Sequence, residues 1–551
     1  MINPLFNPLL LVSSVLLCHV TLIPSVAAQK KGNVTQEHDP KAFLASLPNV
    51  LEKARADGGV KGMSVAVIHK GELVFAQGFG KRNRNDPFTK ETVTHIASVS
   101  KAFTATAVGE LVADGKVDWN ETPVSHYLPE FQLKDPALTA QLTFADLLSH
   151  RTVTWYRNSK PVRELIKQLR HLDLPTTKMT PFVNYNNILY AVAGEAAANV
   201  AGMSYPELIK SKIFKPLGLK SAGLSQPEMA KQSNYALPYD AASFDDAKKG
   251  IYEEGFIDPI PMPDAPAGDI FMNAMDLAQW GRVILKEGEL NGKQVLNKKS
   301  IQETLKSQSI VDDEERRQGF APTVGYGFGW LLDSYKGHTC FRHDGSNPGY
   351  QSILAFFPYD DLVIALLTNV DNTDIPNSLP YYIADGMLGL PKSIDWLSVT
   401  VEKTKELYAK GGDDLPDRIA NKPPSHKLVE YAGEYNHPIY GTIVITLQKD
   451  GKALHMKLRT LEIQLEHYHY ESFKGPVHEF GLKGNVKPHR SYIVDIFGGS
   501  NPRCLSNLVR FPDDDIVVVH LTNIEITVLP KVSLSVLRFK KIEAGAAHKE
   551  G

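Results

Sequence analysis

Ser98 and Lys101 are the residues whose types and spacing most directly suggest chemistry. They stand three positions apart in residues 94–101, THIASVSK, directly before an apolar-periodic run. This spacing puts both side chains on one face at the start of a helix. A serine hydroxyl becomes a good nucleophile when a base takes its proton, and a lysine can be that base when burial or a nearby cation lowers its pKa. The pair therefore predicts acyl transfer through a serine nucleophile.

Two further motifs follow in order. Tyr185 and Asn187 form a Tyr-x-Asn before the helical run 188–200, and His343 and Gly345 form a His-x-Gly before an apolar strand. A bare Ser-x-x-Lys occurs by chance on the order of once or twice in a chain of this length, so the ordered set is what carries specificity. With these three motifs the chain resembles the serine β-lactamase and penicillin-binding-protein superfamily, in the branch that holds class C β-lactamases, D-aminopeptidases and esterases.

The resemblance implies a role for each motif residue. Tyr185 would shuttle a proton between the serine and the leaving group. Asn187 would orient the substrate amide or the lysine. The backbone N–H groups of Ser98 and of Ser346, which follows Gly345, would bind the oxyanion. No cofactor is implied.

His343 departs from the pattern of β-lactamases and transpeptidases, which usually present a lysine there. A lysine attracts a substrate carboxylate at every ordinary pH, whereas a histidine is mostly neutral near pH 7. The His-x-Gly version resembles that of esterases, acyltransferases and D-amino-acid peptidases or amidases. A second departure follows His150, where relatives commonly continue Thr-Ser-Gly and this chain has residues 151–153, RTV. We therefore expect a hydrolase of esters or amides, with D-aminoacyl peptides, amides or esters as substrates and an acyl-enzyme on Ser98.

Three alternatives stay open. The chain could be a β-lactamase or penicillin-binding peptidase, an acyltransferase to a small-molecule acceptor, or a non-catalytic binding protein on the same fold. The intact set of Ser98, Lys101, Tyr185 and His343 argues against the last. The expected partner is a small-molecule or peptide acyl substrate, and homo-oligomerisation is left open.

Composition excludes several function classes. The 551 residues are 43% hydrophobic, which predicts a globular chain of two or three domains. The formal net charge of −2 gives no positive electrostatic field that would attract nucleic acid. Cys18 lies in the leader, and pairing of Cys340 with Cys504 is left open. His467 and His469 share one strand face but have no third ligand, so no metal site is predicted.

The N-terminal segment reads as a signal peptide, residues 1–28. The apolar run 9–25 is followed by Val26, Ala27 and Ala28, whose small side chains fit a signal-peptidase site. Secretion is the prediction, with a membrane anchor as the minor alternative. Asn33 and Asn120 lie in Asn-x-Thr triplets, which in a eukaryotic secretory pathway predict a glycoprotein.

The resemblance implies an α/β (α+β) fold over residues 40–390, with an antiparallel sheet and a helical lobe. The patterns predict helices at 42–56, 188–200, 205–213 and 274–285 and strands at 63–69, 73–78, 350–357 and 362–368. The nucleophile would lie in a cleft between sheet and lobe.

The remaining chain is expected to form a second domain. Residues 391–427 read as a helix, 394–410, followed by a Gly- and Pro-rich linker. Residues 428–540 show alternation, with strands expected at 442–447, 453–458, 464–470, 491–496, 508–511 and 516–521. This predicts a small all-β barrel, which resembles the lipocalin-like C-terminal domain of some family members.

Overall fold

The computed structural model describes residues 40–541 with gaps at 152–161, 172–179, 258, 260, 263, 313–319, 411–417, 438–440, 459–460, 471, 478–489, 498–515 and 521–535. The expected signal peptide, Asn33, Cys504 and the expected strand 508–511 lie outside the described residues. Among the described residues, no helix is both long enough and apolar enough to cross a membrane.

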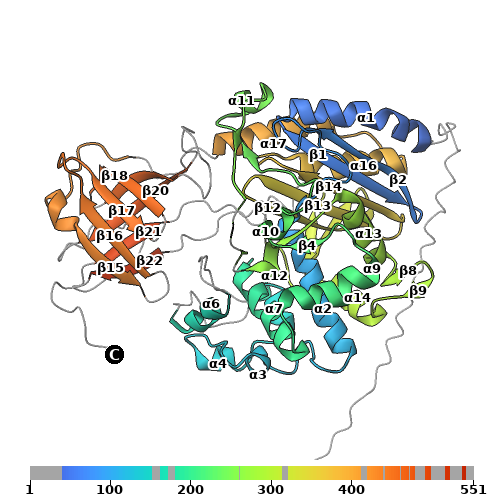
Figure 1. The fold of residues 1–551 in the computed structure, drawn as a ribbon, viewed down its shortest axis with the longest axis horizontal. Coiled ribbons are helices and arrows are strands. Elements are labelled where there is room, and N and C mark those ends of the chain that lie inside the picture. The colour runs from blue at the N-terminus through green and yellow to red at the C-terminus, as the bar shows by residue number, and fades with distance from the viewer. Residues whose placement is uncertain are drawn as a thin grey trace, which may run out of the picture. The chain divides into compact units, whose positions relative to one another are not determined.

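A seven-stranded antiparallel sheet organises the first domain (Figure 1), in the order β10-β11-β12-β13-β14-β1-β2. Its strands are β1 (Gly62–His69), β2 (Glu72–Gly80), β10 (Thr323–Tyr326), β11 (Leu331–Tyr335), β12 (His338–Asn347), β13 (Tyr350–Phe357) and β14 (Leu362–Thr368). The hairpin between β1 and β2 turns at Lys70 and Gly71, both with positive φ, as a two-residue hairpin turn requires. Pairing of β1 with β14 joins segments about 300 residues apart, as in Met63 opposite Thr368.

Both faces of this sheet are buried, so alternate residues of its central strands point into two different cores. On β13, Leu354 and Phe356 join the core that contains α2, while Ile353 and Ala355 join the core that contains α1. We call these the front face and the back face. The four strands predicted at 63–69, 73–78, 350–357 and 362–368 are confirmed, but the sheet is larger than expected because β10, β11 and β12 extend it.

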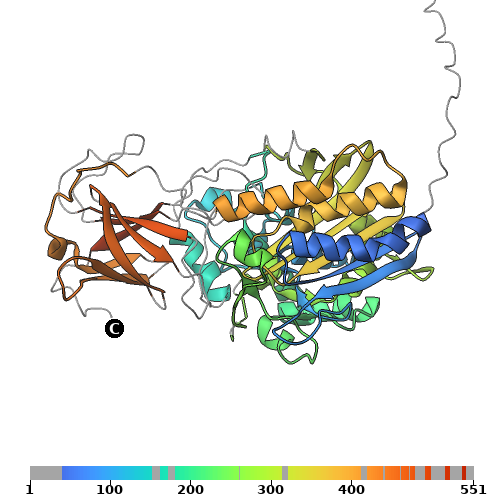
Figure 2. The same cartoon turned by 90° about the horizontal axis from the view of Figure 1, so that it is seen from above.

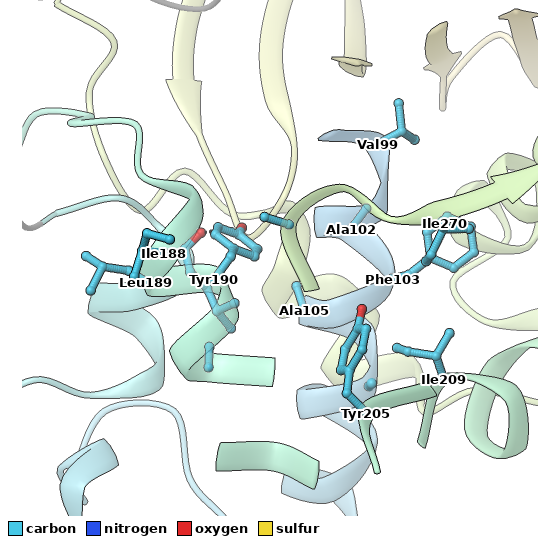
Figure 3. Packing of buried hydrophobic residues seen from close by; sticks show 14 of the residues in the cluster. Val99, Ala102, Phe103, Ala105, Ile188, Leu189, Tyr190, Tyr205, Ile209 and Ile270 are labelled. Carbon is cyan, nitrogen blue, oxygen red and sulfur yellow. Dashed lines mark hydrogen bonds between the residues drawn. The ribbon is translucent and has the colours of Figure 1, made fainter. Parts of the chain in front are cut away.

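The helices of the front face form the helical lobe, with α2 (Ser100–Ala113), α7 (Asn187–Ala201) and α13 (Ala274–Leu285) at its centre. Figure 3 shows part of this core, with Ala102 of α2 between Tyr190 of α7 and Ile270. The smaller helices of the domain are α3 (Val124–Tyr127), α4 (Pro136–Thr139), α5 (Phe144–Leu148), α6 (Val162–Gln168), α8 (Tyr205–Ile209), α9 (Lys215–Leu217), α10 (Gln226–Met229), α11 (Phe244–Lys248), α12 (Ala265–Gly268) and α14 (Lys298–Leu305). The helix expected at 205–213 instead ends at Ile209 and passes through a π-helical turn, Lys210–Phe214, into α9.

The back face is covered by α1 (Pro40–Asp57), α16 (Ile375–Leu388) and α17 (Trp396–Lys410), which run across the sheet in Figure 2. Trp396 of α17 is buried and donates from Nε1 to the Tyr335 hydroxyl at 3.0 Å. The prediction that α17 belongs with the linker is therefore wrong. The helix packs into the core of the first domain because its indole fills that face of the sheet.

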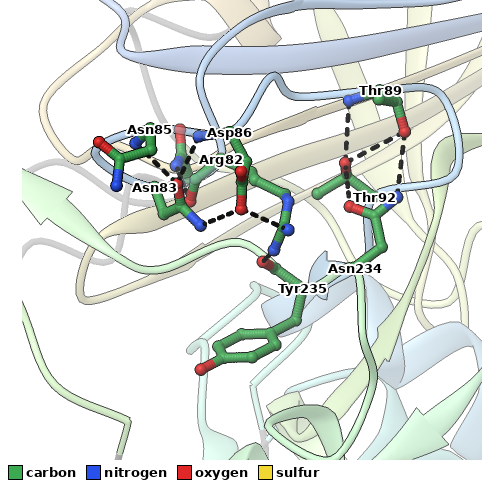
Figure 4. A network of polar contacts seen from close by, with 9 residues as sticks. Arg82, Asn83, Asn85, Asp86, Thr89, Thr92, Asn234 and Tyr235 are labelled. Atoms are coloured by element: carbon green, nitrogen blue, oxygen red, sulfur yellow. Dashed lines mark hydrogen bonds and ion pairs between the residues drawn. The ribbon is translucent and has the colours of Figure 1, made fainter.

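Short strands pair in small sheets, β3-β7-β4, β5-β6 and β8-β9. They are β3 (Thr94–His95), β4 (Gly223–Leu224), β5 (Tyr239–Asp240), β6 (Glu253–Glu254), β7 (Ile270–Met272), β8 (Glu289–Leu290) and β9 (Lys293–Gln294). The segment between β2 and β3 is fixed by polar contacts (Figure 4). Arg82 donates to the Tyr235 carbonyl at 3.0 Å, and Thr92 donates to Asn234 at 2.8 Å. These bonds set the path of the chain into the Ser98 turn.

The C-terminal strands close into an antiparallel barrel, β15 to β22 in chain order. They are β15 (Gly433–His437), β16 (Gly441–Leu447), β17 (Leu454–Leu458), β18 (Leu461–His469), β19 (Ser472–Val477), β20 (Arg490–Phe497), β21 (Ile516–His520) and β22 (Val536–Lys541). The expected small β-domain is confirmed, although β15, β19 and β22 were not predicted. The lipocalin resemblance stays a prediction. The His467 imidazole binds the Tyr470 carbonyl at 2.8 Å, and that of His469 accepts from the Ile419 N–H at 3.3 Å.

Candidate active site

Ser98 lies in a 3₁₀ turn, Ala97–Val99, between β3 and α2. Ala97 has a φ of +46°, a conformation that costs energy for a residue with a Cβ and that often marks a functional turn. Ile96 and Val99 are completely buried, whereas Ser98, which lies between them in the chain, is half-buried. The turn therefore holds the hydroxyl at the surface of the lobe, directly before α2.

Lys101 is completely buried in the first turn of α2. Its Nζ donates to Ser98 Oγ at 3.0 Å and to the Ala267 carbonyl at 2.9 Å. Burial lowers the pKa of Lys101 to about 7, although the carboxylates of Asp264 and Asp344 oppose the change. Near neutral pH, a large fraction of this amine is uncharged and able to accept the Ser98 proton.

Tyr185 and Asn187 lie at the start of α7. The Tyr185 ring is buried, with Lys101 Nζ 4.6 Å from its centroid. Asn186, between them, caps α7 by accepting the Leu189 N–H at 3.0 Å, which fixes the backbone of the motif. Asn187 Oδ1 is buried and has no hydrogen-bond partner among the described residues.

His343 is completely buried on the front face of β12. Its Nδ1 lies 2.6 Å from the Asp344 carbonyl and its Nε2 lies 3.1 Å from the Tyr326 hydroxyl. A carbonyl can only accept, so Nδ1 carries the proton and Nε2 accepts from the tyrosine. Burial lowers the pKa of His343 to about 4, so the imidazole is neutral near pH 7.

Gly345 brings β12 against the Ser98 turn. A Cβ there would lie 2.2 Å from the Ile96 carbonyl oxygen and 3.0 Å from the Ser98 backbone nitrogen, so no side chain fits. This close approach places Ser346, the next residue and an exposed one, beside the nucleophile turn. The structure thus brings together the residues that the three motifs single out.

Asn347, at the end of β12, links three segments of the site through its side chain. Its Nδ2 lies 3.0 Å from His95 Nδ1 and donates to the Gly268 carbonyl at 3.1 Å. Gly268 follows Ala267, which accepts from Lys101, so one side chain connects β12, β3 and the segment that holds the lysine. Burial lowers the pKa of His95 to about 3, which keeps this connection uncharged.

Sequence reasoning missed four residues that surround the lysine and the motif tyrosine. Tyr190 places its ring centroid 5.6 Å from Lys101 Nζ. Tyr326 bonds His343, and Asp264 acts on Lys101 through its charge. His150 lies with its ring centroid 4.4 Å from that of Tyr185. His150 itself belongs to the resemblance, but no local pattern indicates these contacts, because each joins separate segments of the chain.

Comparisons with known proteins match the same region. A beta-lactamase family model matches residues 47–387, and a domain of unknown function (DUF3471) matches residues 417–488. An unguisins hydrolase of Aspergillus campestris (strain IBT 28561) is 25% identical over 429 residues, 72% of this chain and 76% of that protein. Penicillin-binding protein 4 of Amycolatopsis lactamdurans is 28% identical over 338 residues, 58% of this chain and 83% of that protein.

The fold is also found among solved structures. The crystal structure of D-amino acid amidase from Ochrobactrum anthropi SV3, complexed with D-phenylalanine, superposes with a TM-score of 0.50 at 23% identity. The superposition covers 63% of this chain and 100% of that chain. At this identity the likeness shows a shared fold.

Proposed function

The chain belongs to the beta-lactamase family and is a serine hydrolase, and from this premise we propose that it cleaves neutral or amino-bearing esters and amides, D-aminoacyl derivatives among them, through an acyl-enzyme on Ser98. The observation that carries the proposal is the complete burial of two bases on neutral hydrogen-bond partners: Lys101, with Nζ 3.0 Å from Ser98 Oγ, and His343, which bonds a hydroxyl and a carbonyl. One supplies a base for acylation. The other offers no positive charge to a substrate carboxylate.

Acylation begins when neutral Lys101 accepts the Ser98 proton and Oγ attacks the substrate carbonyl. The N–H groups of Ser98 and Ser346 would stabilise the oxyanion, a contribution of about 10²–10³-fold in rate per donor in other serine hydrolases. As the intermediate collapses, the bond to the leaving group breaks, and the proton that Lys101 took from Ser98 is relayed through Tyr185 to that group. Water then attacks the acyl-enzyme: the base takes a proton from the water, and this proton returns to Ser98 Oγ as the acyl bond breaks, which releases the acid and restores Ser98.

The charges around Lys101 support the choice of substrate. Arg342 lies on the back face of β12, where it binds Asp333 at 2.5 Å and Asp344 at 3.3 Å, so its charge is already paired. Asp264 begins the short helix α12 without capping it, and its carboxylate is half-buried. An ammonium group on the substrate would be favoured by this field, while a carboxylate would not.

The test is a product assay across matched substrates: a neutral ester, a D-aminoacyl amide, the L-aminoacyl amide, and a penicillin, each with and without an acceptor amine. We expect kcat/KM to be higher for the first two than for the penicillin, with Ser98→Ala removing turnover and covalent labelling. Preference for the penicillin would support a β-lactamase or penicillin-binding peptidase. Product formed on the amine instead of the free acid would support an acyltransferase. A labelled Ser98→Ala protein would refute the nucleophile assignment.

Secretion is also part of the proposal, supported by the apolar run 9–25 and the small residues that end at Ala28. N-terminal sequencing of material exported by the expressing cell should begin near Gln29. Recovery of the uncleaved chain with membranes would support the anchor instead. Asn120 is exposed in the first domain, so loss of mass on glycosidase treatment of the exported protein would support glycosylation.

A further inference from the structure

We propose that His150 is the positioning residue for Tyr185, acting as a clamp that binds the backbone N–H groups of the two residues on either side of this tyrosine. The inference rests on the proposed function, because it assigns a partner to the same proton-transfer group. The clamp consists of two hydrogen bonds that His150 accepts. The Asn184 N–H donates to the His150 carbonyl at 2.7 Å, and the Asn186 N–H donates to His150 Nδ1 at 3.0 Å.

The ring of His150 completes the clamp. Its centroid lies 4.4 Å from that of Tyr185, and 5.0 Å from those of Tyr190 and Tyr326. The imidazole is completely buried among these three rings. Tyr185 is therefore held from its backbone and from one side of its ring, while Lys101 lies 4.6 Å from its ring centroid. Small displacements of a proton-transfer group cost rate, with a 1 Å misplacement worth about 10²-fold.

The backbone at this position restricts which residues can do this. His150 has a φ of +59°, in the left-handed region where glycine, asparagine, aspartate and histidine are the usual residues. Only some of these carry an acceptor one bond beyond Cγ, where Nδ1 stands in histidine. Asparagine can place its amide oxygen there, and glycine offers nothing.

The clamp works only while the imidazole is neutral, because a protonated Nδ1 would face the Asn186 N–H donor to donor. Burial, together with the charges of Lys101 and His343, lowers the pKa of His150 well below its usual range. The bond to Asn186 therefore persists over the working pH range. Among the described residues, the titratable groups that contact the imidazole or act on it through their charge are Tyr185, Tyr190, Tyr326, Lys101 and His343. The carboxylates of Asp264 and Asp344 act on Lys101 in turn.

The test compares His150→Gly with His150→Asn in the full chain, using the best substrate of the assay above. Both residues tolerate the left-handed backbone, but only H150N keeps the acceptor. We expect H150G to lower kcat by about 10²-fold with KM changed less than about threefold, and H150N to stay within about tenfold of the native kcat. H150G also opens space for water beside Lys101, so the acidic limb of its kcat/KM profile should move to higher pH, while that of H150N should not.

A folded H150G protein with native kcat and a native pH profile would overturn the proposal. Thermal melting identifies a variant that does not fold. If H150G does not fold, H150N decides the question: a kcat within about tenfold of native supports the clamp, and a loss as large as that of Tyr185→Phe overturns it. Failure of the proposed function is distinct, because it would appear as turnover or labelling that survives Ser98→Ala in a protein with native His150.

Discussion

The two faces of strand β12 bury ionisable groups in opposite ways. On the back face, Arg342 binds Asp333 at 2.5 Å and Asp344 at 3.3 Å, and Tyr381 donates to Asp333 at 2.6 Å. On the front face, His343 meets only neutral partners and lies near Lys101, which binds a hydroxyl and a carbonyl. Among the residues that the structure describes, one strand therefore separates a paired charge network from a region where the buried bases have no carboxylate within hydrogen-bond distance.

The pKa directions record this difference. The pKa of Arg342 is raised above its usual range because its carboxylate partners outweigh burial, whereas burial dominates at Lys101 and His343 and lowers both pKa values. Depth of burial is thus not what makes a base reactive, because all three side chains are largely or completely buried. Reactivity comes from burial without a paired opposite charge. Burial of Lys101 without a paired carboxylate lowers the stability of the fold, and the same burial lowers the pKa of the amine beside Ser98.

The largest effect that this comparison predicts is on activity at the front face. Lys101→Met keeps the length and apolar character of the side chain but removes the base, so kcat should fall by about 10²–10⁴-fold or more. The measurement is single-turnover acylation by a chromogenic ester. Arg342→Lys is the matched control, since it retains a back-face cation and should keep acylation within about tenfold. Near-native acylation by the methionine variant would assign the base to another group.

The next effect is on stability at the back face. Arg342→Met should lower the free energy of unfolding by roughly 3–5 kcal/mol, because it leaves the carboxylates of Asp333 and Asp344 buried without their partner. Denaturant unfolding near pH 7 measures the change. The double change Arg342→Met with Asp333→Asn should recover part of the loss. A single variant as stable as the native protein would mean that the network contributes nothing.

A change to methionine at the front face, Lys101→Met, should instead raise the free energy of unfolding. The folded pKa of Lys101 is about 7, while an unfolded lysine has a pKa of about 10.4, so between these pH values the unfolded chain binds a proton that the native chain does not. Native stability from this residue therefore rises with pH across that window, and the penalty is nearly complete at pH 7. Lys101→Met should remove this penalty but also the two hydrogen bonds of Nζ, so the net rise in the free energy of unfolding should be roughly 1–2 kcal/mol at pH 7.

Measurement at two pH values tests this third prediction. The gain from Lys101→Met should shrink toward pH 10, where a solvated lysine also begins to lose its proton. A variant destabilised at pH 7 would show that the bonds to Ser98 and Ala267 outweigh the cost of burial. In that case the contrast between the two faces would concern reactivity alone.

Sequence predicts most of this fold where apolar runs end at clear turn signals. The bounds expected at 274–285, 350–357 and 362–368 coincide with α13, β13 and β14. Strand β12 was not predicted, because Arg342, His343 and Asp344 interrupt its apolar alternation. These three polar side chains alternate between the back face and the front face of the strand. The residues that mask the strand in the sequence are therefore the ones that give its two faces their different chemistry.

The same limit applies to the site. The motifs indicated Ser98, Lys101, Tyr185 and His343, since residue type and order carry that information locally. The burial that neutralises Lys101 and the contacts of His150 come from segments far apart in the chain, and spacing alone does not report them. What remained hidden is therefore the electrostatic environment that makes the residues reactive.

The smallest expected effect concerns the end of the back face. The Gly- and Pro-containing stretch before the barrel predicts few contacts across it, so a chain truncated after Lys422 should keep the Tm of the first domain within about 2 °C and its kcat within about twofold. Truncation after Pro391 is the matched control, because it also removes α17. Without Trp396, the Tyr335 hydroxyl and Asp385 lose the indole donor, at 3.0 Å and 3.3 Å, and the back face loses a buried aromatic side chain worth roughly 3–5 kcal/mol.

Circular dichroism melts and ester turnover of both truncated chains separate the two cases. If the longer chain melts as early as the shorter one, the barrel supports the first domain and the boundary lies elsewhere. The longer chain could instead keep the Tm of the first domain but change its preference for large substrates. That result would mean that the barrel affects substrate access and does not stabilise the first domain.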